Sequence, residues 1–338
     1  GDGDLTDNGD GTWTLVIPVG NEIPDGTYDV EVTVTDTAGN TANDATVDEL
    51  IIDTVAPTVP TVDELIANTS TPTITGTLDS ADEISVTVNT VTYTEGDGDL
   101  VDNGDGTWEL EIPLGNEIPD GTYDVEVTVT DTAGNTANDA TVDELIIDTV
   151  APTVPTVDEL IANTSTPTIT GTLDSADEIS VIVNGVTYTE GDGDLTDNGD
   201  GTWTLVIPVG NEISDGTYDV VVTVTDAAGN TANDATVDEL IIDTVSPTIP
   251  TVDELIANTS TPTITGTLDS VDEISVLVNG VTYTEGDGDL TDNGDGTWEL
   301  VIPVGNEIPD GTYDVDVTVT DTAGNTASDA TVDELIID

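Results

Sequence analysis

The sequence predicts an all-β chain of tandem antiparallel sandwich domains, and three observations support this prediction. Apolar residues, mostly Val and Ile, alternate with Thr, Asp and Glu over short runs. Asn-Gly, Asp-Gly and Pro, which favour turns, separate these runs. Long stretches of sequence also recur at one fixed spacing, which indicates repeated domains.

The repeat has a period of 95 residues, because TVDELIANTSTPTITGTLDS begins at Thr61, Thr156 and Thr251. This period is too long for a solenoid repeat and fits one β-sandwich domain of about 100 residues. We therefore expect complete domains at residues 54–148, 149–243 and 244–338. Residues 1–53 align with the second half of a unit, so we interpret them as the C-terminal half of a truncated repeat in a longer array.

Within residues 54–148 the alternating runs predict seven strands, with no helical stretch between them. These strands are expected at residues 61–66, 71–78, 83–88, 91–95, 107–113, 122–131 and 140–148. Asn89-Thr90 joins the third strand to the fourth. The later units have Asn184-Gly185 and Asn279-Gly280 there, which is typical of a type I′ hairpin.

Seven short strands in this order favour an immunoglobulin-like antiparallel β-sandwich. Tyr123, in the run DGTY before the longest strand, fits the tyrosine corner of that fold. Another antiparallel sandwich remains an alternative. We expect the sandwiches to follow one another as an extended rod, because two prolines in each linker, such as Pro57 and Pro60, favour an extended connection.

Composition excludes several classes of function. The 338 residues include 72 Asp and Glu but no Lys, Arg, His or Cys, so the formal net charge is −72. Without cations the chain lacks the contacts that hold nucleic acid, and without His, Lys or Cys it lacks the usual catalytic bases and nucleophiles. No apolar run approaches the roughly 20 residues of a membrane span, so we expect no membrane insertion. Disorder in the absence of divalent cations remains an alternative.

Three runs resemble a known family: DTVAPTVPTVDELIANTSTPTITGTL, DGTYDVEVTVTDTAGNTA and DNGDGTW. They are similar to the bacterial Ig-like repeats in the extender regions of giant Gram-negative RTX-type surface adhesins. The acidic version resembles the calcium-rigidified extenders of ice-binding adhesins from cold marine bacteria. The resemblance covers the three full units and the half unit. It implies a secreted, extracellular spacer at the bacterial surface, with a role in cell adhesion and biofilms and no catalysis.

Metal sites are expected where consecutive domains meet. In an immunoglobulin-like sandwich the B–C loop, here residues 78–83, the F–G loop, here residues 130–139, and the N-terminus share one end. Oxygen ligands from these loops, without a nearby cation, suit Ca²⁺, which accepts six to eight oxygens in loose geometry. The predicted ligand sets are Asp53, Asp79, Asp82, Asp131 and Asn135; Asp148, Asp174, Asp177, Asp226 and Asn230; and Asp243, Asp269, Asp272, Asp321 and Asn325.

Each motif also has an interpretation without metal. Asp131 and Asn135 could form only a turn, and Asp79 and Asp82 could simply cap a loop. The acidic run at residues 95–106 could be a calcium loop or ordinary turns, because it lacks the EF-hand spacing. Its acidic residues are Asp97, Asp99, Asp102 and Asp105.

The functional prediction is a non-catalytic extender that holds a distal ligand-binding domain away from the cell. Calcium and the neighbouring repeats of the same chain are its expected partners, and it is expected to be a monomeric rod. A self-assembling matrix filament or surface-layer protein is the alternative, and a receptor-binding module is a weaker one. Paired carboxylates could also suggest a glycosidase, but these acids lie in loops and on solvent faces rather than in an apolar cleft.

Overall fold

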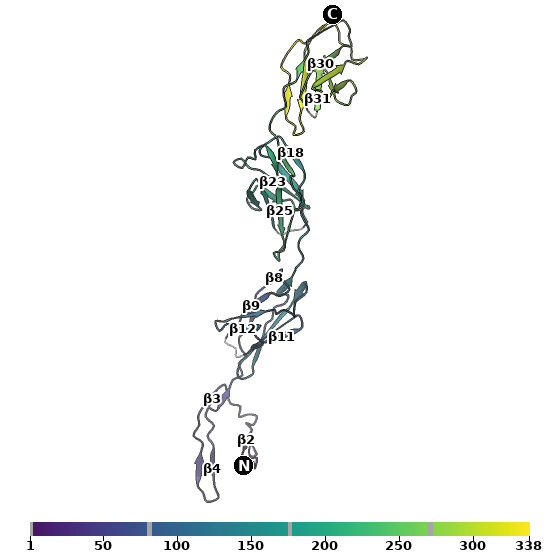
Figure 1. Cartoon of the computed structure of the whole chain (residues 1–338). Helices are drawn as coiled ribbons and strands as arrows, with labels where there is room; N and C mark the ends of the chain where they lie inside the picture. The colour runs from purple at the N-terminus through teal and green to yellow at the C-terminus, as the bar shows by residue number, and fades with distance from the viewer. Residues whose placement is uncertain (1–2, 80–82, 175–177, 270–272) are drawn as a thin grey trace. The chain divides into compact units, whose positions relative to one another are not determined.

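The structure is a computed structural model that describes residues 3–79, 83–174, 178–269 and 273–338. The described residues form strands and turns, and none of them is helical, which confirms the all-β prediction (Figure 1). They form two compact units, Gly1–Thr149 and Val150–Asp338. Within these residues no helix is long and apolar enough to cross a membrane.

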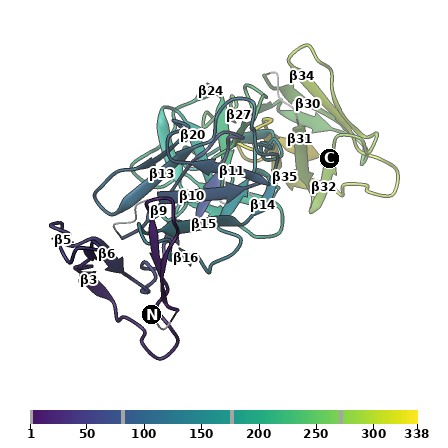
Figure 2. The ribbon, with the colours of Figure 1, turned by 90° about the horizontal axis from the view of Figure 1, so that it is seen from below.

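The repeat at residues 54–148 is built from three sheets. The first has the order β12 (Leu100–Asp102), β13 (Thr107–Glu111), β9 (Thr73–Thr77) and β7 (Thr61–Val62). The second, visible in Figure 2, has the order β11 (Val91–Thr94), β10 (Glu83–Val88), β15 (Val125–Thr130) and β16 (Thr136–Asn138). The third has the order β14 (Gly121–Tyr123), β17 (Leu145–Ile147) and β8 (Leu65–Ala67). All pairs are antiparallel except β17 with β8, which is parallel. This is the immunoglobulin-like arrangement that the sequence predicts.

The repeats at residues 149–243 and 244–338 have the same arrangement, except that among the described residues of 149–243 no strand corresponds to β7, so the first sheet of that repeat has three strands. The strands of the first are β18 (Leu160–Ala162), β19 (Thr168–Thr172), β20 (Glu178–Val183), β21 (Val186–Thr189), β22 (Leu195–Asp197), β23 (Thr202–Val206), β24 (Gly216–Tyr218), β25 (Val220–Thr225), β26 (Thr231–Asn233) and β27 (Leu240–Ile242). Those of the second are β28 (Thr251–Val252), β29 (Leu255–Ala257), β30 (Thr263–Thr267), β31 (Glu273–Val278), β32 (Val281–Thr284), β33 (Leu290–Asp292), β34 (Thr297–Val301), β35 (Gly311–Tyr313), β36 (Val315–Thr320), β37 (Thr326–Ser328) and β38 (Leu335–Ile337).

The described part of the first segment, residues 3–53, forms three two-stranded sheets. They are β1 (Leu5–Asp7) with β2 (Trp13–Leu15), β3 (Gly26–Tyr28) with β6 (Leu50–Ile52), and β4 (Thr33–Thr35) with β5 (Thr41–Asn43). These strands correspond to β12–β17 of the next repeat, so this segment has the second half of the sandwich pattern.

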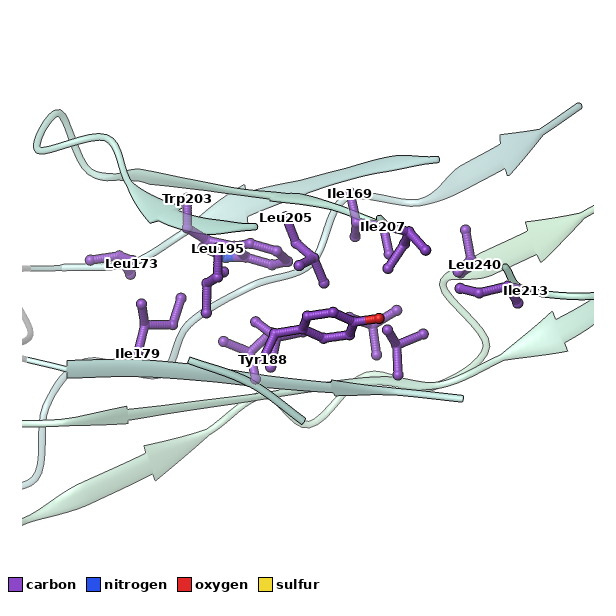
Figure 3. Close-up of a cluster of buried hydrophobic side chains, with 14 of the residues drawn as sticks. Ile169, Leu173, Ile179, Tyr188, Leu195, Trp203, Leu205, Ile207, Ile213 and Leu240 are labelled. Carbon is purple, nitrogen blue, oxygen red and sulfur yellow. The ribbon is translucent and has the colours of Figure 1, made fainter. Parts of the chain in front are cut away.

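Each complete repeat has its own apolar core between its sheets. Figure 3 shows the core of residues 149–243, with Trp203 and Leu205 on one sheet and Tyr188 on the other. In the preceding repeat, Trp108 is fully buried and its Nε1 donates a hydrogen bond to the Thr61 carbonyl at 3.1 Å. Gly76 is required beneath it, because a Cβ there would collide with the Thr61 carbonyl oxygen and lie 2.7 Å from the indole nitrogen.

Two local predictions of the sequence are confirmed. Asn89 and Thr90 both have positive φ angles, 47° and 67°, as a type I′ turn requires. The hydroxyl of Tyr123 donates to the Pro119 carbonyl at 2.8 Å, which is the tyrosine corner.

The strand boundaries differ from those expected. The run 122–131 is divided at Asp124 into β14 and β15, and the final strand begins at Leu145 rather than at residue 140. Asp143 interrupts the final strand, because it has a φ of 66°. Its amide donates a hydrogen bond to the Asp124 carboxylate at 2.7 Å, at the division between β14 and β15. Two segments expected as loops also contain strands: β12 lies in the acidic run 95–106, and β16 lies in the expected F–G loop.

Candidate metal-binding junctions

The turn between β15 and β16 is held by its own aspartate. Oδ1 of Asp131 accepts hydrogen bonds from the amides of Ala133 and Asn135, both at 2.9 Å. The Asp131 amide donates to the Asn135 carbonyl at 3.1 Å, and Gly134 has a φ of 90°. The run D-T-A-G-N therefore folds as a capped turn, which was one of its two interpretations.

The asparagine of this turn reaches the end of the preceding repeat. Asn135 Nδ2 donates to Asp131 Oδ2 at 2.9 Å and to the main-chain carbonyl of Asp53 at 3.1 Å. In the repeat at residues 244–338, Asn325 makes the same pair of bonds, to Asp321 Oδ2 at 2.9 Å and to the Asp243 carbonyl at 2.7 Å. The structure thus brings the asparagine of each of these two turns to the aspartate at the end of the preceding repeat, and both belong to the same predicted set. The contact uses the backbone carbonyl of that aspartate and not its carboxylate.

Other residues of the predicted sets make hydrogen bonds at or near the linkers. Oδ1 of Asp53 accepts from the Val55 amide at 3.0 Å, and Oδ2 of Asp79 accepts from the Thr58 hydroxyl at 3.1 Å. The same bonds recur as Val245 to Asp243 at 3.1 Å, Thr153 to Asp174 at 3.2 Å and Thr248 to Asp269 at 3.0 Å. The Asp148 amide donates to the Ala67 carbonyl at 3.0 Å. Each B–C loop is therefore tied to the linker that enters its own repeat.

The ligand sets are only partly described by the structure. Asp82, Asp177 and Asp272 lie outside the described residues. Among the described residues, no group of three acidic side chains is arranged so that it could hold a metal ion.

Hydrogen bonding lowers the pKa of the aspartate in each of these turns. The Asn135 side chain and the amides of the turn lower the pKa of the Asp131 carboxyl below its ordinary value. At Asp226, burial acts to raise the pKa, but the hydrogen bonds from Asn230 and the turn amides together outweigh it, so the pKa is lowered. The pKa of Asp321 is lowered in the same way. Each turn therefore carries a full negative charge at neutral pH, and the chain has no cationic side chain to balance it.

Comparison with known proteins identifies the family. The family model of the bacterial Ig-like domain matches residues 2–54, 59–149, 154–244 and 250–338. The chain belongs to the bacterial Ig-like domain family. No curated protein matches it.

Several solved structures are similar to this chain of bacterial Ig-like repeats. One is a Ca²⁺-stabilized adhesin with which an Antarctic bacterium reaches out and binds ice; it is 25% identical, with 91% of this chain and 81% of that chain covered and a TM-score of 0.35. Another is a 1.5-MDa bacterial ice-binding adhesin, 24% identical, with 84% and 99% covered and a TM-score of 0.35. A third is a tetra-tandem repeat in the extending region of a large adhesion protein, 21% identical, with 94% and 84% covered and a TM-score of 0.29.

A second contact, found where a bacterial Ig-like repeat is followed by a linker, was not anticipated from the sequence. Oδ1 of Asp120 accepts from the amide of Thr149 at 3.1 Å and from its hydroxyl at 2.9 Å. Asp215 binds Thr244 in the same way, at 3.1 and 2.8 Å, and Asp25 accepts from the Thr54 hydroxyl at 2.9 Å. The partners are 29 residues apart, and only their joint recurrence every 95 residues could have indicated the pairing.

The acidic run 95–106 uses three of its carboxylates in local turns. Asp97 accepts from the Thr94 hydroxyl at 2.9 Å, Asp102 from the Gly104 amide at 2.8 Å, and Asp105 from the Thr107 hydroxyl at 2.6 Å. These bonds support the interpretation of this run as turns flanking β12.

Each complete Ig-like repeat also buries one glutamate that sequence reasoning missed. Glu144 Oε2 accepts from the Val125 amide at 3.2 Å, and its buried Oε1 has no hydrogen-bond partner among the described residues. Glu239 and Glu334 are placed in the same way. This hydrogen bond gives a partner to the Val125 amide, which is the first amide of β15. The alternating run T-V-D-E-L gives no sign of it, because it resembles an exposed strand.

Proposed function

We propose that this chain is a non-catalytic, calcium-rigidified spacer of a large secreted bacterial surface adhesin, which projects a distal ligand-binding domain from the cell. The supporting observation is the repeated junction contact, in which Asn135 binds the Asp53 carbonyl and Asn325 binds the Asp243 carbonyl. A hydrogen bond from a capped turn to the last strand of the preceding repeat limits how the two repeats can rotate. Repetition of one such joint is useful to a spacer and has no value for a single catalytic site.

Calcium is the proposed partner of these junctions, through the residues of the three predicted ligand sets. Two like charges about 4 Å apart at an effective dielectric near 20 repel by about 4 kcal/mol before screening. The chain has 72 carboxylates and no cationic side chain, so only ions from solution can reverse this repulsion. A calcium concentration about 100-fold above the dissociation constant would stabilise the folded state by about 2.7 kcal/mol per site.

This mechanism links location to folding. Extracellular calcium modules bind with dissociation constants of about 10⁻⁴–10⁻³ M, which cytoplasmic calcium does not reach. The chain would remain unfolded before secretion and would fold and stiffen at the bacterial surface. The absence of cysteine is consistent with this route, because folding then depends on no disulfide.

The test is thermal melting of the full chain, followed by circular dichroism in EDTA and then in calcium. Calcium is expected to raise the melting temperature, and to raise it less in Asp131→Asn, which removes one junction charge. Glu126→Gln removes a charge from the exposed face of β15, outside both the predicted sets and the acidic run 95–106, and should leave the calcium response unchanged. The same β spectrum and melting temperature in EDTA and in calcium would refute the calcium role.

A second candidate is a self-assembling extracellular structural protein. Leu114, Val209 and Val304 occupy the same turn of successive repeats and are 89%, 90% and 91% exposed. An apolar side chain that recurs on the surface at one spacing is a feature that lateral association could use. Light scattering with and without calcium separates the candidates, since filaments support assembly and a monomer supports the spacer.

A further inference from the structure

The outer face of one sheet in the repeat at residues 149–243 carries an exposed apolar pair. Ile182 of β20 and Val221 of β25 are cross-strand partners, and they are 41% and 43% exposed. Both point away from the core, because the residues next to each of them along its strand are buried. Figure 3 shows the inward side of the same sheet, where Ile179 and Tyr188 lie among the core side chains.

The corresponding positions of the other complete repeats show that this pair belongs to one repeat alone. Ninety-five residues earlier the partners are Thr87 and Glu126, and 95 residues later they are Leu277 and Asp316, in the same registers. The serine two positions earlier on the middle strand is the same in all three repeats. A cross-strand pair with no polar member therefore distinguishes this repeat from two others with nearly the same sequence.

A hollow of 460 Å³ lies beside this pair on the same sheet. It is lined by Glu178 and Ser180 of β20, Thr189 of β21, Thr225 of β25 and Glu190. Ser180 and Ile182 are alternate residues of one strand, so they are neighbours on this face, about 7 Å apart. Two carboxylates and three hydroxyl groups thus adjoin an apolar surface. The repeat at residues 54–148 has an equivalent hollow of 290 Å³, but a polar pair lies beside it.

Charge decides which kind of partner fits this face. The chain has 72 carboxylates and no cationic side chain, so it cannot neutralise Glu178 and Glu190 itself. A second copy of the chain has the same excess of negative charge and is repelled. A partner with a basic side chain is attracted, and an apolar side chain beside the basic one can cover Ile182 and Val221.

We propose that this face binds an extended basic segment of another protein, in which a Lys or Arg is followed two positions later by an apolar residue. Alternate side chains of an extended segment lie on one side, about 7 Å apart, which matches the spacing between the hollow and the apolar pair. The basic side chain enters the hollow, and the apolar side chain covers Ile182 and Val221. Charge provides the attraction, and the apolar pair provides the preference for this repeat.

The test titrates the full chain, in calcium and at fixed salt, into a fluorescein-labelled peptide of sequence T-T-K-T-V-T-T and reads its fluorescence anisotropy. The double variant Ile182→Thr with Val221→Glu gives this face the pair of the preceding repeat. It should raise the protein concentration at half saturation about tenfold, because the valine of the peptide then covers no apolar surface. This variant is more negative than the unaltered chain, so nonspecific attraction would instead be stronger.

The neighbouring repeat supplies the matched controls. The double variant Thr87→Ile with Glu126→Val should create a second site of similar affinity. Glu178→Gln should weaken binding, whereas Glu83→Gln removes the same charge from the equivalent hollow without an apolar pair and should leave binding unchanged. A peptide of sequence T-T-K-T-S-T-T, which has the same charge, should bind every chain only weakly.

Three results would overturn the inference. The first is a chain with Ile182→Thr and Val221→Glu that binds the valine peptide as tightly as the unaltered chain, or more tightly. The second is equal binding of the valine and serine peptides to the unaltered chain. The third is an equal effect of Glu178→Gln and Glu83→Gln. Circular dichroism in the same buffer shows whether each variant is folded, and the double variants only exchange residues that neighbouring repeats already contain.

Discussion

The hairpin between β10 and β11 offers a matched comparison between repeats. Asn89 and Thr90 have φ angles of 47° and 67° in the first complete repeat. The next repeat has Asn184 and Gly185 there, at 49° and 76°. The backbone is the same, but Thr90 is a β-branched residue in a conformation that favours glycine. Replacement of Thr90 by Gly should therefore stabilise this repeat.

The expected gain follows from two opposing terms. A left-handed conformation costs a non-glycine residue roughly 1–2 kcal/mol. The substitution loses about 0.5–1 kcal/mol of this gain, because glycine gives the unfolded chain greater conformational freedom. The midpoints of the two ranges leave a net stabilisation of about 0.75 kcal/mol, which corresponds to about three- to fourfold slower opening of the hairpin. The hydrogen bond between the Thr87 and Thr92 hydroxyls, at 2.8 Å, should remain.

Hydrogen exchange read by mass spectrometry is the appropriate assay, because peptides of this hairpin differ in sequence between repeats. Thr90→Gly should slow exchange in residues 83–94 alone. The reverse change, Gly185→Thr, should speed exchange in residues 178–189 by a similar factor. Faster exchange in Thr90→Gly, or no effect of Gly185→Thr, would refute the reasoning from backbone strain.

Three further changes test the core, the buried glutamate and the junction turn. Gly76→Ala should destabilise its repeat by about 1–3 kcal/mol or more in urea unfolding, because the new methyl group collides with the backbone and with Trp108. Glu144→Ala should cost about 1–3 kcal/mol by leaving a buried amide unpaired, whereas Glu144→Gln keeps an acceptor and should cost clearly less in the same assay. Asn135→Ala should lower the melting temperature at neutral pH. The pKa of Asp131 is depressed in the folded state, so the stabilisation by its ionised carboxylate is present above about pH 4 and is lost at lower pH. The difference in melting temperature between Asn135→Ala and the unaltered chain should therefore shrink as the pH falls below about 4. A difference that does not depend on pH would contradict this role.

Much of the fold could be predicted because each strand has one buried face. The pattern of Trp108, Leu110 and Ile112 against polar neighbours specifies a strand and the side that packs inward. The division of the last strands could not be predicted in this way. It depends on a positive φ at Asp143 and on a bond between two aspartates 19 residues apart, which no periodic pattern encodes.

The junction could be predicted in part. The turn chemistry of Asp131 and Asn135 follows from local sequence, because Asp, Gly and Asn at these positions satisfy one another within five residues. The contact with Asp53 uses a backbone carbonyl, which every residue possesses, so no residue type marks it. The linker anchors at Asp120 and Asp79 are hidden for a related reason, since Asp is abundant throughout the chain.

Calcium stiffening of the junctions is most directly tested by pulsed dipolar distance measurement between neighbouring repeats. The chain has no cysteine, so the substitutions Val209→Cys and Val304→Cys allow two spin labels to be attached. The labels then lie at equivalent exposed positions of the repeats at residues 149–243 and 244–338. The proposal expects a broad distance distribution in EDTA that narrows to one peak in calcium. Equal breadth in both conditions would contradict it.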